Sequence, residues 1–174
     1  MENNYALALG RLRSLHQKLD AEAFSEYDSI IRAQLQEGII EKVESNEEKR
    51  KEAYYLPHKA IFTPEKTTKV RVVYDGSARP SKLKNLLNDV IYKGSNLLEN
   101  LVAIFLRFRF HRIAILSDIE KAFLQLLIDE SDRNYVRFLW FDNYSPLFAS
   151  SKIVVYRFAR VAFSIIASPF LYTR

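Results

Sequence analysis

Residues 113–123 read Ile-Ala-Ile-Leu-Ser-Asp-Ile-Glu-Lys-Ala-Phe. The apolar run at the start of this stretch predicts a short buried strand, 112–116, that ends at Ser117 and Asp118. A carboxylate at the end of such a strand projects from a rigid element into the adjacent cleft. That placement suits a Mg²⁺ ligand, because Mg²⁺ takes one or two carboxylates from a protein. In a second interpretation Asp118 caps the short helix or turn predicted for 119–127, and the segment alone favours this cap.

Upstream of this stretch, the pattern predicts a helix, a loop and a hairpin. A largely buried helix, 96–108, is opened by an asparagine N-cap with a glutamate three residues later. Residues 76–94 contain two glycines, a proline and many polar residues, which is typical of an irregular loop. Short β-branched or aromatic runs at 59–62 and 70–74 predict the two strands of a hairpin.

The N-terminal part of the chain is predicted to be helical. Apolar residues recur at spacings of three and four over 5–19 and again over 24–35, and Gly38 follows where a helix C-terminus is expected. A charged stretch without apolar periodicity comes next and is predicted to be a linker. The expected organisation has three parts: an N-terminal helical segment at 1–43, a charged loop or linker at 44–53, and a second domain at 54–174.

Downstream of 113–123, the sequence predicts two further strands and a last helix. Asp129, Glu130 and Asp132 lie in a polar stretch that is best interpreted as a solvated loop. Strands are predicted at 135–141 and 152–158, and a helix is predicted to begin near Ser168, because the proline that follows suits a first helical turn. The expected fold class is therefore α+β.

The composition excludes several kinds of chemistry. The 174 residues include no cysteine, which excludes disulfide scaffolds, thiolate zinc sites and cysteine nucleophiles. Three histidines, far apart in the sequence, make a poor basis for a histidine-rich metal centre. Four glycines form no Walker-type or dinucleotide-binding loop. No signal peptide or membrane-spanning stretch is recognisable, so the expectation is a soluble intracellular protein, cytoplasmic or nuclear.

The positive charge is concentrated in one part of the chain. The whole sequence carries a formal net charge of +5. Residues 1–65 hold 9 basic and 12 acidic side chains, a net of −3, whereas residues 66–174 hold 17 and 9, a net of +8. A basic excess of this kind is compatible with a nucleic-acid partner, and it is equally compatible with an ordinary solvated basic surface.

A series of short motifs follows in a fixed order. They are Leu-Gln-Glu-Gly-Ile-Ile-Glu at 35–41, Tyr-Leu-Pro-His-Lys-Ala at 55–60, Thr-Thr-Lys-Val-Arg-Val-Val-Tyr-Asp-Gly-Ser-Ala at 67–78, Leu-Asn-Asp-Val at 87–90, Leu-Arg-Phe-Arg at 106–109, the stretch at 113–123, the basic and aromatic run at 156–163, and Ser-Pro-Phe-Leu at 168–171. In this order the series resembles the reverse transcriptase of BEL/Pao-type LTR retrotransposons, over nearly the whole chain. The resemblance implies the fingers and the first half of the palm of a right-hand polymerase.

The resemblance also assigns roles to individual residues. Asp118 matches the catalytic carboxylate that binds Mg²⁺, with the Ile119 carbonyl as the adjacent backbone ligand. Phe123 matches the aromatic gate that excludes a ribose 2′-OH, and Phe163 matches a pocket residue beside the incoming nucleotide and the template base. The remaining nucleotide-binding positions are Lys69 and Arg71, which match the residues that hold the triphosphate, and Ala122, next to the gate.

Without the family, the same side chains have ordinary interpretations. Phe123 is then expected to be a core aromatic residue on a short helix. Lys69 and Arg71 are then expected to belong to a solvated face of the hairpin. Arginine nevertheless suits a triphosphate well, because its planar fork binds phosphate oxygens bidentately.

Two departures from the family pattern affect these expectations. Ser164 stands where the family usually has glycine, which suggests a narrower or more restricted pocket. The aromatic-x-Asp-Asp hairpin that supplies the other metal-binding carboxylates has no counterpart in the sequence, and neither do the thumb, RNase H, protease and integrase segments. One aspartate and one carbonyl make a weak Mg²⁺ site, so the chain alone is expected not to polymerise.

Three functions remain open from the sequence. The first is a fragment of an RNA-directed DNA polymerase that acts on an RNA template, a DNA primer and dNTPs. The second is a non-catalytic remnant that binds RNA or an RNA–DNA duplex through its phosphates. The third is an unrelated metal-dependent phosphotransferase built on Asp118, which the ordered motifs argue against.

Overall fold

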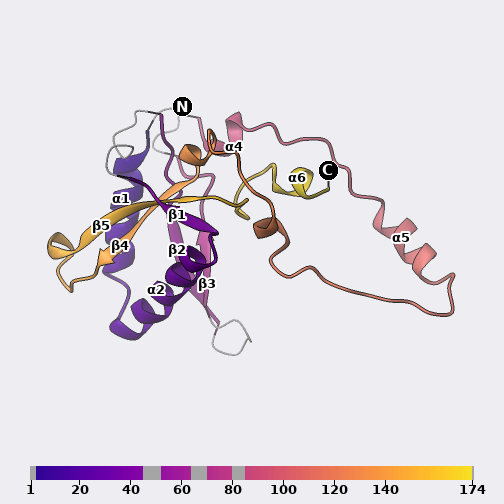
Figure 1. Cartoon of the computed structure of the whole chain (residues 1–174), viewed down its shortest axis with the longest axis horizontal. Helices are drawn as coiled ribbons and strands as arrows, with labels where there is room; N and C mark the ends of the chain where they lie inside the picture. The colour runs from indigo at the N-terminus through magenta and orange to yellow at the C-terminus, as the bar shows by residue number, and fades with distance from the viewer. Residues whose placement is uncertain (1–2, 45–51, 64–69, 80–84, 174) are drawn as a thin grey trace.

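The central sheet has three antiparallel strands. The computed structural model describes residues 3–44, 52–63, 70–79 and 85–173. Within them the order of the sheet is β1 (Ile40–Lys42), β5 (Lys152–Phe158), β4 (Arg137–Asn143) (Figure 1). Ile40 pairs with Phe158 and Trp140 with Val154, and a register shift follows Phe141. The strands predicted at 135–141 and 152–158 are confirmed by β4 and β5.

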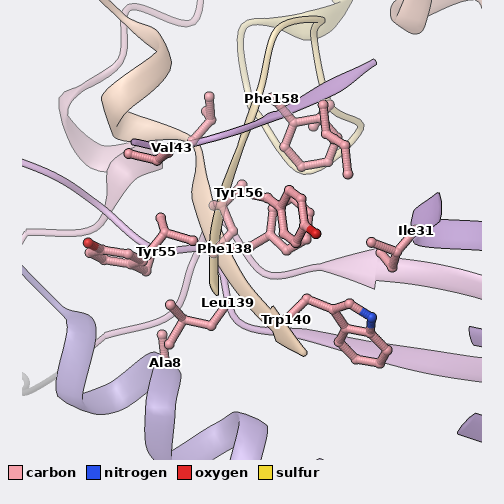
Figure 2. Packing of buried hydrophobic residues seen from close by; sticks show 14 of the residues in the cluster. Ala8, Ile31, Val43, Tyr55, Phe138, Leu139, Trp140, Tyr156 and Phe158 are labelled. Carbon is pink, nitrogen blue, oxygen red and sulfur yellow. The ribbon is translucent and has the colours of Figure 1, made fainter. Parts of the chain in front are cut away.

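The two faces of β4 are covered by different elements. Successive side chains of a strand point to opposite faces. Leu139 points toward Ala8 of helix α1 (Tyr5–His16), whereas Trp140 lies on the opposite side of the strand (Figure 2). There its ring packs on Tyr27 of helix α2 (Ala21–Gln36), with centroids 4.5 Å apart. The sheet is thus buried on both faces, which explains the continuous apolar run of β4.

Helix α2 ends in a turn at a glycine, and this turn leads directly into the sheet. Gly38 has a φ of +65°, a left-handed conformation that glycine adopts without strain. The Ile39 amide donates to the Gln34 carbonyl and the Gly38 amide to the Leu35 carbonyl, the Schellman pattern. The chain then enters β1 directly. Both predicted N-terminal helices and the predicted role of Gly38 are confirmed.

A separate hairpin packs against the sheet beside α2. Strand β2 (His58–Phe62) pairs with β3 (Val70–Tyr74), as predicted. Its inner end packs against the sheet and is half-buried. There the ring of His58 lies 5.6 Å from the Trp140 ring, and the ring of Tyr74 lies 4.8 Å from the Phe158 ring. The described residues of the predicted loop at 76–94 contain one short helix, α4 (Leu87–Val90).

The N-terminal helices and the later strands share one core. Ala8, Leu12, Tyr27 and Ile31 belong to the same buried cluster as the side chains of β4 and β5. Most of the predicted linker, 44–53, lies outside the described residues, and the boundaries of the expected parts remain predictions.

The region 97–119 departs from the prediction. Helix α5 spans Leu101–Phe108 with Asn100, not Asn96, as its N-cap, and it buries none of its residues. The predicted strand 112–116 is absent from the structure, and its apolar side chains are exposed. Both predictions of burial are wrong, because in the described part of the chain no element covers this region. Figure 1 shows α5 and the connection that follows it extending away from the sheet.

The chain returns to the body through short elements. A 3₁₀ turn, η1 (Ala122–Gln125), occupies the position predicted for a short helix or turn. Two more 3₁₀ turns, η2 (Arg133–Tyr135) and η3 (Phe148–Ser150), flank β4. Helix α6 (Ser168–Thr173) begins where the Ser-Pro pair predicted it. The fold is α+β, and within its described residues no helix has the length and apolar character needed to span a bilayer.

Candidate functional site

Two aromatic residues assigned to the nucleotide pocket lie in contact. Phe123 of η1 and Phe163, after β5, have ring centroids 5.0 Å apart and planes at 73°, an edge-to-face contact. Phe123 is half-buried, whereas Phe163 is 69% exposed. The structure therefore brings together two residues from distant parts of the sequence, and it leaves one ring open to a ligand.

A third ring completes the group. Tyr172 of α6 meets Phe123 at 5.8 Å with perpendicular planes. We call Phe123, Phe163 and Tyr172 the aromatic cluster. The sequence does not single out Tyr172, because a helix of six residues gives no clear periodicity. Its position four residues after Ser168 nevertheless places it on the same helix face as Ser168. Exposed aromatic rings of this kind can stack a nucleobase, because every base has a π-face.

Hydrogen bonds between η1 and the end of β5 explain why Phe123 and Phe163 meet. Arg160 donates through Nη1 to the Leu124 carbonyl at 3.1 Å, and the Val161 amide donates to the Leu126 carbonyl at 3.0 Å. These bonds hold η1 beside the segment that leads into Phe163.

The entry to η1 has an unusual backbone. Lys121 has a φ of +52°, the left-handed region that side chains other than glycine rarely adopt. Its ammonium group lies 3.1 Å from a Glu37 carboxylate oxygen at the end of α2, in an exposed ion pair. The Leu124 amide donates to the Lys121 carbonyl at 2.8 Å, which closes the turn. Ala122, at its start, is half-buried.

Asp118 and Ile119 lie outside the aromatic cluster. Both are exposed, on the extended connection between α5 and η1. The N-cap position of η1 is occupied by Lys121, and no side chain forms a capping hydrogen bond there. The interpretation of Asp118 as the cap of this turn is therefore wrong. The Asp118 carboxylate is thus accessible to solvent and stabilises no element in the described part of the chain.

The residues around Asp118 do not form a metal site. Among the described residues, no group of three or more histidine, aspartate or glutamate side chains lies close enough to share a metal ion. Asp118 and the Ile119 carbonyl alone are too few ligands to hold Mg²⁺ without the phosphates of a nucleotide, and Mg²⁺ binding remains a prediction.

The acidic loop is solvated, as predicted. Asp129, Glu130 and Asp132 are all exposed. The Asp129 carboxylate accepts hydrogen bonds from the Ser131 hydroxyl and amide, which lower the pKa of this carboxyl. The Asp129 carboxylate thus finds its hydrogen-bond donors within the loop itself.

The predicted triphosphate residues are only partly described. Lys69 lies outside the described residues. Arg71 is exposed on β3, where it pairs across the hairpin with Ile61. Its position is compatible with a phosphate ligand and with a solvated strand face, and no interaction among the described residues joins it to the aromatic cluster.

Ser164 does not strain the backbone where the family usually has glycine. Its φ lies outside the left-handed region, so the conformation does not require glycine. Its hydroxyl is buried, with no hydrogen-bond partner among the described residues. The serine hydroxyl is therefore enclosed by protein atoms, and the expected narrower pocket remains a prediction.

The histidine of the hairpin, His58, packs against the core. The His58 imidazole donates from Nε2 to the Leu139 carbonyl at 2.9 Å, and its Nδ1 accepts from the Tyr27 hydroxyl. Burial lowers the pKa of His58 to about 4, which keeps the ring neutral. Burial likewise raises the pKa of Tyr27 and Tyr74. This neutral hydrogen-bonded group ties the hairpin to the sheet.

No protein-family model matches the sequence, and no curated protein matches it either.

Proposed function

We propose that the chain is part of an RNA-directed DNA polymerase of the BEL/Pao reverse transcriptase class. The observation that carries this proposal is the contact between Phe123 and Phe163, with centroids 5.0 Å apart. The resemblance assigns both residues to one nucleotide pocket, and nothing in their local sequence requires them to meet. The ordered motifs and the net charge of +8 over residues 66–174 also support a nucleic-acid partner.

In this proposal the residues have distinct tasks. Phe123 fills the space of a ribose 2′-OH and so favours dNTPs. Phe163 stacks beside the incoming nucleotide and the template base. Lys69 and Arg71 bind the triphosphate. An RNA template and a DNA primer lie across the basic part of the chain.

Metal-dependent chemistry needs more carboxylates than Asp118. With the Ile119 carbonyl, Asp118 would contribute one side of a Mg²⁺ site whose other carboxylates come from a further polymerase segment. RNase H, protease and integrase segments would complete the polyprotein. We therefore expect the chain alone to bind template–primer without extending it.

A non-catalytic nucleic-acid-binding protein is the second candidate. The observation that favours it is the exposure of Phe163, because an open aromatic ring can stack on any unpaired base. The two candidates differ in the role of Asp118. Only the polymerase fragment requires this carboxylate for a response to Mg²⁺ and dNTP.

The test is a fluorescence anisotropy titration of a labelled RNA–DNA template–primer with wild-type chain, Phe163→Ala and Phe62→Ala. Phe62 is the matched control, since it is an exposed phenylalanine on the hairpin and does not contact the aromatic cluster. Loss of base stacking is worth about 1–3 kcal/mol, so Phe163→Ala should weaken binding about tenfold. Phe62→Ala should leave the affinity unchanged. Equal affinities for Phe163→Ala and wild type would contradict the proposal.

A second pair of measurements separates the two candidates. If the chain is a polymerase fragment, Mg²⁺ with the complementary dNTP should tighten template–primer binding, and Asp118→Ala should remove that gain. If it is a non-catalytic binding protein, neither effect should be seen. Metal-dependent primer extension by the chain alone, abolished by Asp118→Ala, would overturn the expectation that it does not polymerise.

A further inference from the structure

The turn that carries Phe163 is held by one side chain from another part of the molecule. Asn88, in α4, donates through Nδ2 to the Ser164 carbonyl at 3.0 Å. Its Oδ1 accepts from the Ile166 amide, also at 3.0 Å. One amide group thereby satisfies a backbone acceptor and a backbone donor of the same turn, immediately after Phe163.

Gly76 provides the space in which this turn sits. A Cβ atom on Gly76 would lie 2.6 Å from the Ser164 carbonyl oxygen and 3.1 Å from Asn88 Nδ2. The nearest obstacle is backbone, so it cannot move aside as a flexible side chain would. Gly76 is not in the left-handed region. Glycine is required here because two backbone segments approach closely.

The surroundings make this support rigid. Next to Asn88, Leu87 is buried, and the Asp89 carboxylate accepts from the Leu86 amide at the start of α4. On the other side, the Tyr54 hydroxyl donates to the Ala78 carbonyl at 2.6 Å. Tyr54 belongs to the main core. The turn after Phe163 is therefore anchored to the folded body through α4 and the segment after β3.

We infer that Asn88 is a positioning residue for nucleotide binding and that Gly76 is its steric counterpart. By fixing the backbone on the C-terminal side of Phe163, they hold its ring against Phe123 with one face open. Asn88 acts through Phe163 and needs no contact with the nucleotide. The role in binding rests on the proposed function, whereas the role in fixing the turn does not.

This inference gives a function to one residue in each of two motifs. Gly76 lies in the motif 67–78 and Asn88 in the motif 87–90. In the structure both converge on the same backbone oxygen, that of Ser164. Two neighbouring motifs therefore cooperate with a distant segment in placing one aromatic ring.

The first experiment measures amide hydrogen exchange at Ile166 in the full chain, without any ligand. Asn88→Ala removes the acceptor of the Ile166 amide, and Gly76→Ala pushes the Ser164 carbonyl out of place. Both variants should raise the exchange rate of Ile166 about tenfold or more. Gly10→Ala is the matched control, since a Cβ on Gly10 meets nothing within 4 Å, and it should change nothing at Ile166. Unchanged exchange in Asn88→Ala and Gly76→Ala would overturn the inference.

The second experiment tests whether Asn88 acts through Phe163. Template–primer affinity is measured for wild type, Asn88→Ala, Phe163→Ala and the double variant. If Asn88 works through the ring, Asn88→Ala should weaken binding about five- to tenfold in the wild-type background and by less than twofold when Phe163 is already alanine. Equal losses in both backgrounds would refute the positioning role.

The two experiments fail in different ways. If wild-type chain binds no template–primer, the proposed function and the binding role of Asn88 fail together, and the Ile166 exchange still decides whether Asn88 and Gly76 fix the turn. If wild type binds and the Asn88→Ala effect persists without Phe163, the proposed function survives and the inference does not.

Discussion

Strand β4 and the region 97–119 are similar in composition and opposite in environment. Trp140 in β4 is completely buried, whereas Leu116, in an equally apolar run, is 89% exposed. The helices α1 and α2 and the β2–β3 hairpin cover the faces of β4, and no described element covers 97–119. Apolar sequence thus specifies a buried strand only where the chain also supplies the partners.

The backbone shows the same contrast. Strand β4 pairs with β5 along its whole length. Between Phe110 and Lys121, by contrast, no hydrogen bond joins the backbone to the backbone of another described residue. The two regions are therefore expected to differ in their contribution to stability as they do in burial.

The largest effect is expected for Trp140→Ala. The substitution removes a fully buried ring and its hydrogen bond to the Asp28 carboxylate, 2.8 Å long. The free energy of unfolding should fall by about 3–5 kcal/mol, as for other buried aromatic residues. Chemical denaturation followed by circular dichroism measures this loss. A loss below 1 kcal/mol would mean that β4 is not in the core.

An intermediate effect is expected on acidification. Burial lowers the pKa of His58 from 6.5 to about 4, so the unfolded chain takes up a proton more readily than the folded chain. His58 therefore stabilises the fold fully above pH 6.5. This contribution should be lost as the pH falls toward 4, by about 3 kcal/mol in total.

Denaturation curves between pH 7.5 and pH 4.5 test this dependence. His58→Gln should flatten the decline in stability over this range, because it removes the titrating group. His111→Gln is the matched control, since His111 is exposed on the uncovered region, and it should leave the decline unchanged. A decline that survives His58→Gln would assign the pH dependence to other groups.

The smallest effect is expected in the region 97–119. Replacing Ile113 and Ile115 together by serine removes two exposed side chains and no buried contact. The free energy of unfolding should change by less than about 0.5 kcal/mol. Chemical denaturation under the conditions used for Trp140→Ala gives a direct comparison. A loss of 2 kcal/mol or more would show that this region packs against the fold.

The fold was predictable where local signals and partners agree. The turn at Gly38 follows from glycine's freedom in the left-handed region, and the strands β2 to β5 follow from runs of β-branched and aromatic residues. The prediction of a buried strand at 112–116 was wrong, because burial depends on elements elsewhere in the chain that pack against the strand. A local sequence pattern carries no information about those elements. The same limit explains why α5 was expected to be buried.

The site was predictable only in part, for a related reason. The resemblance selected Phe123 and Phe163, and the structure shows that their rings touch. Tyr172 and Asn88 were not selected. Their roles depend on contacts with residues far away in the sequence, an aromatic ring in one case and two backbone groups in the other. Neither kind of contact leaves a periodic signal.

The central claim is that a nucleobase stacks on the aromatic cluster, and one fluorescence measurement tests it directly. A template–primer carries 2-aminopurine as the first unpaired template base, whose emission is quenched when the base stacks on an aromatic ring. Saturating wild-type chain should quench this emission, and Phe163→Ala, at a concentration that also saturates the duplex, should not. Emission that stays unchanged when wild-type chain is fully bound, or equal quenching by Phe163→Ala, would contradict the claim.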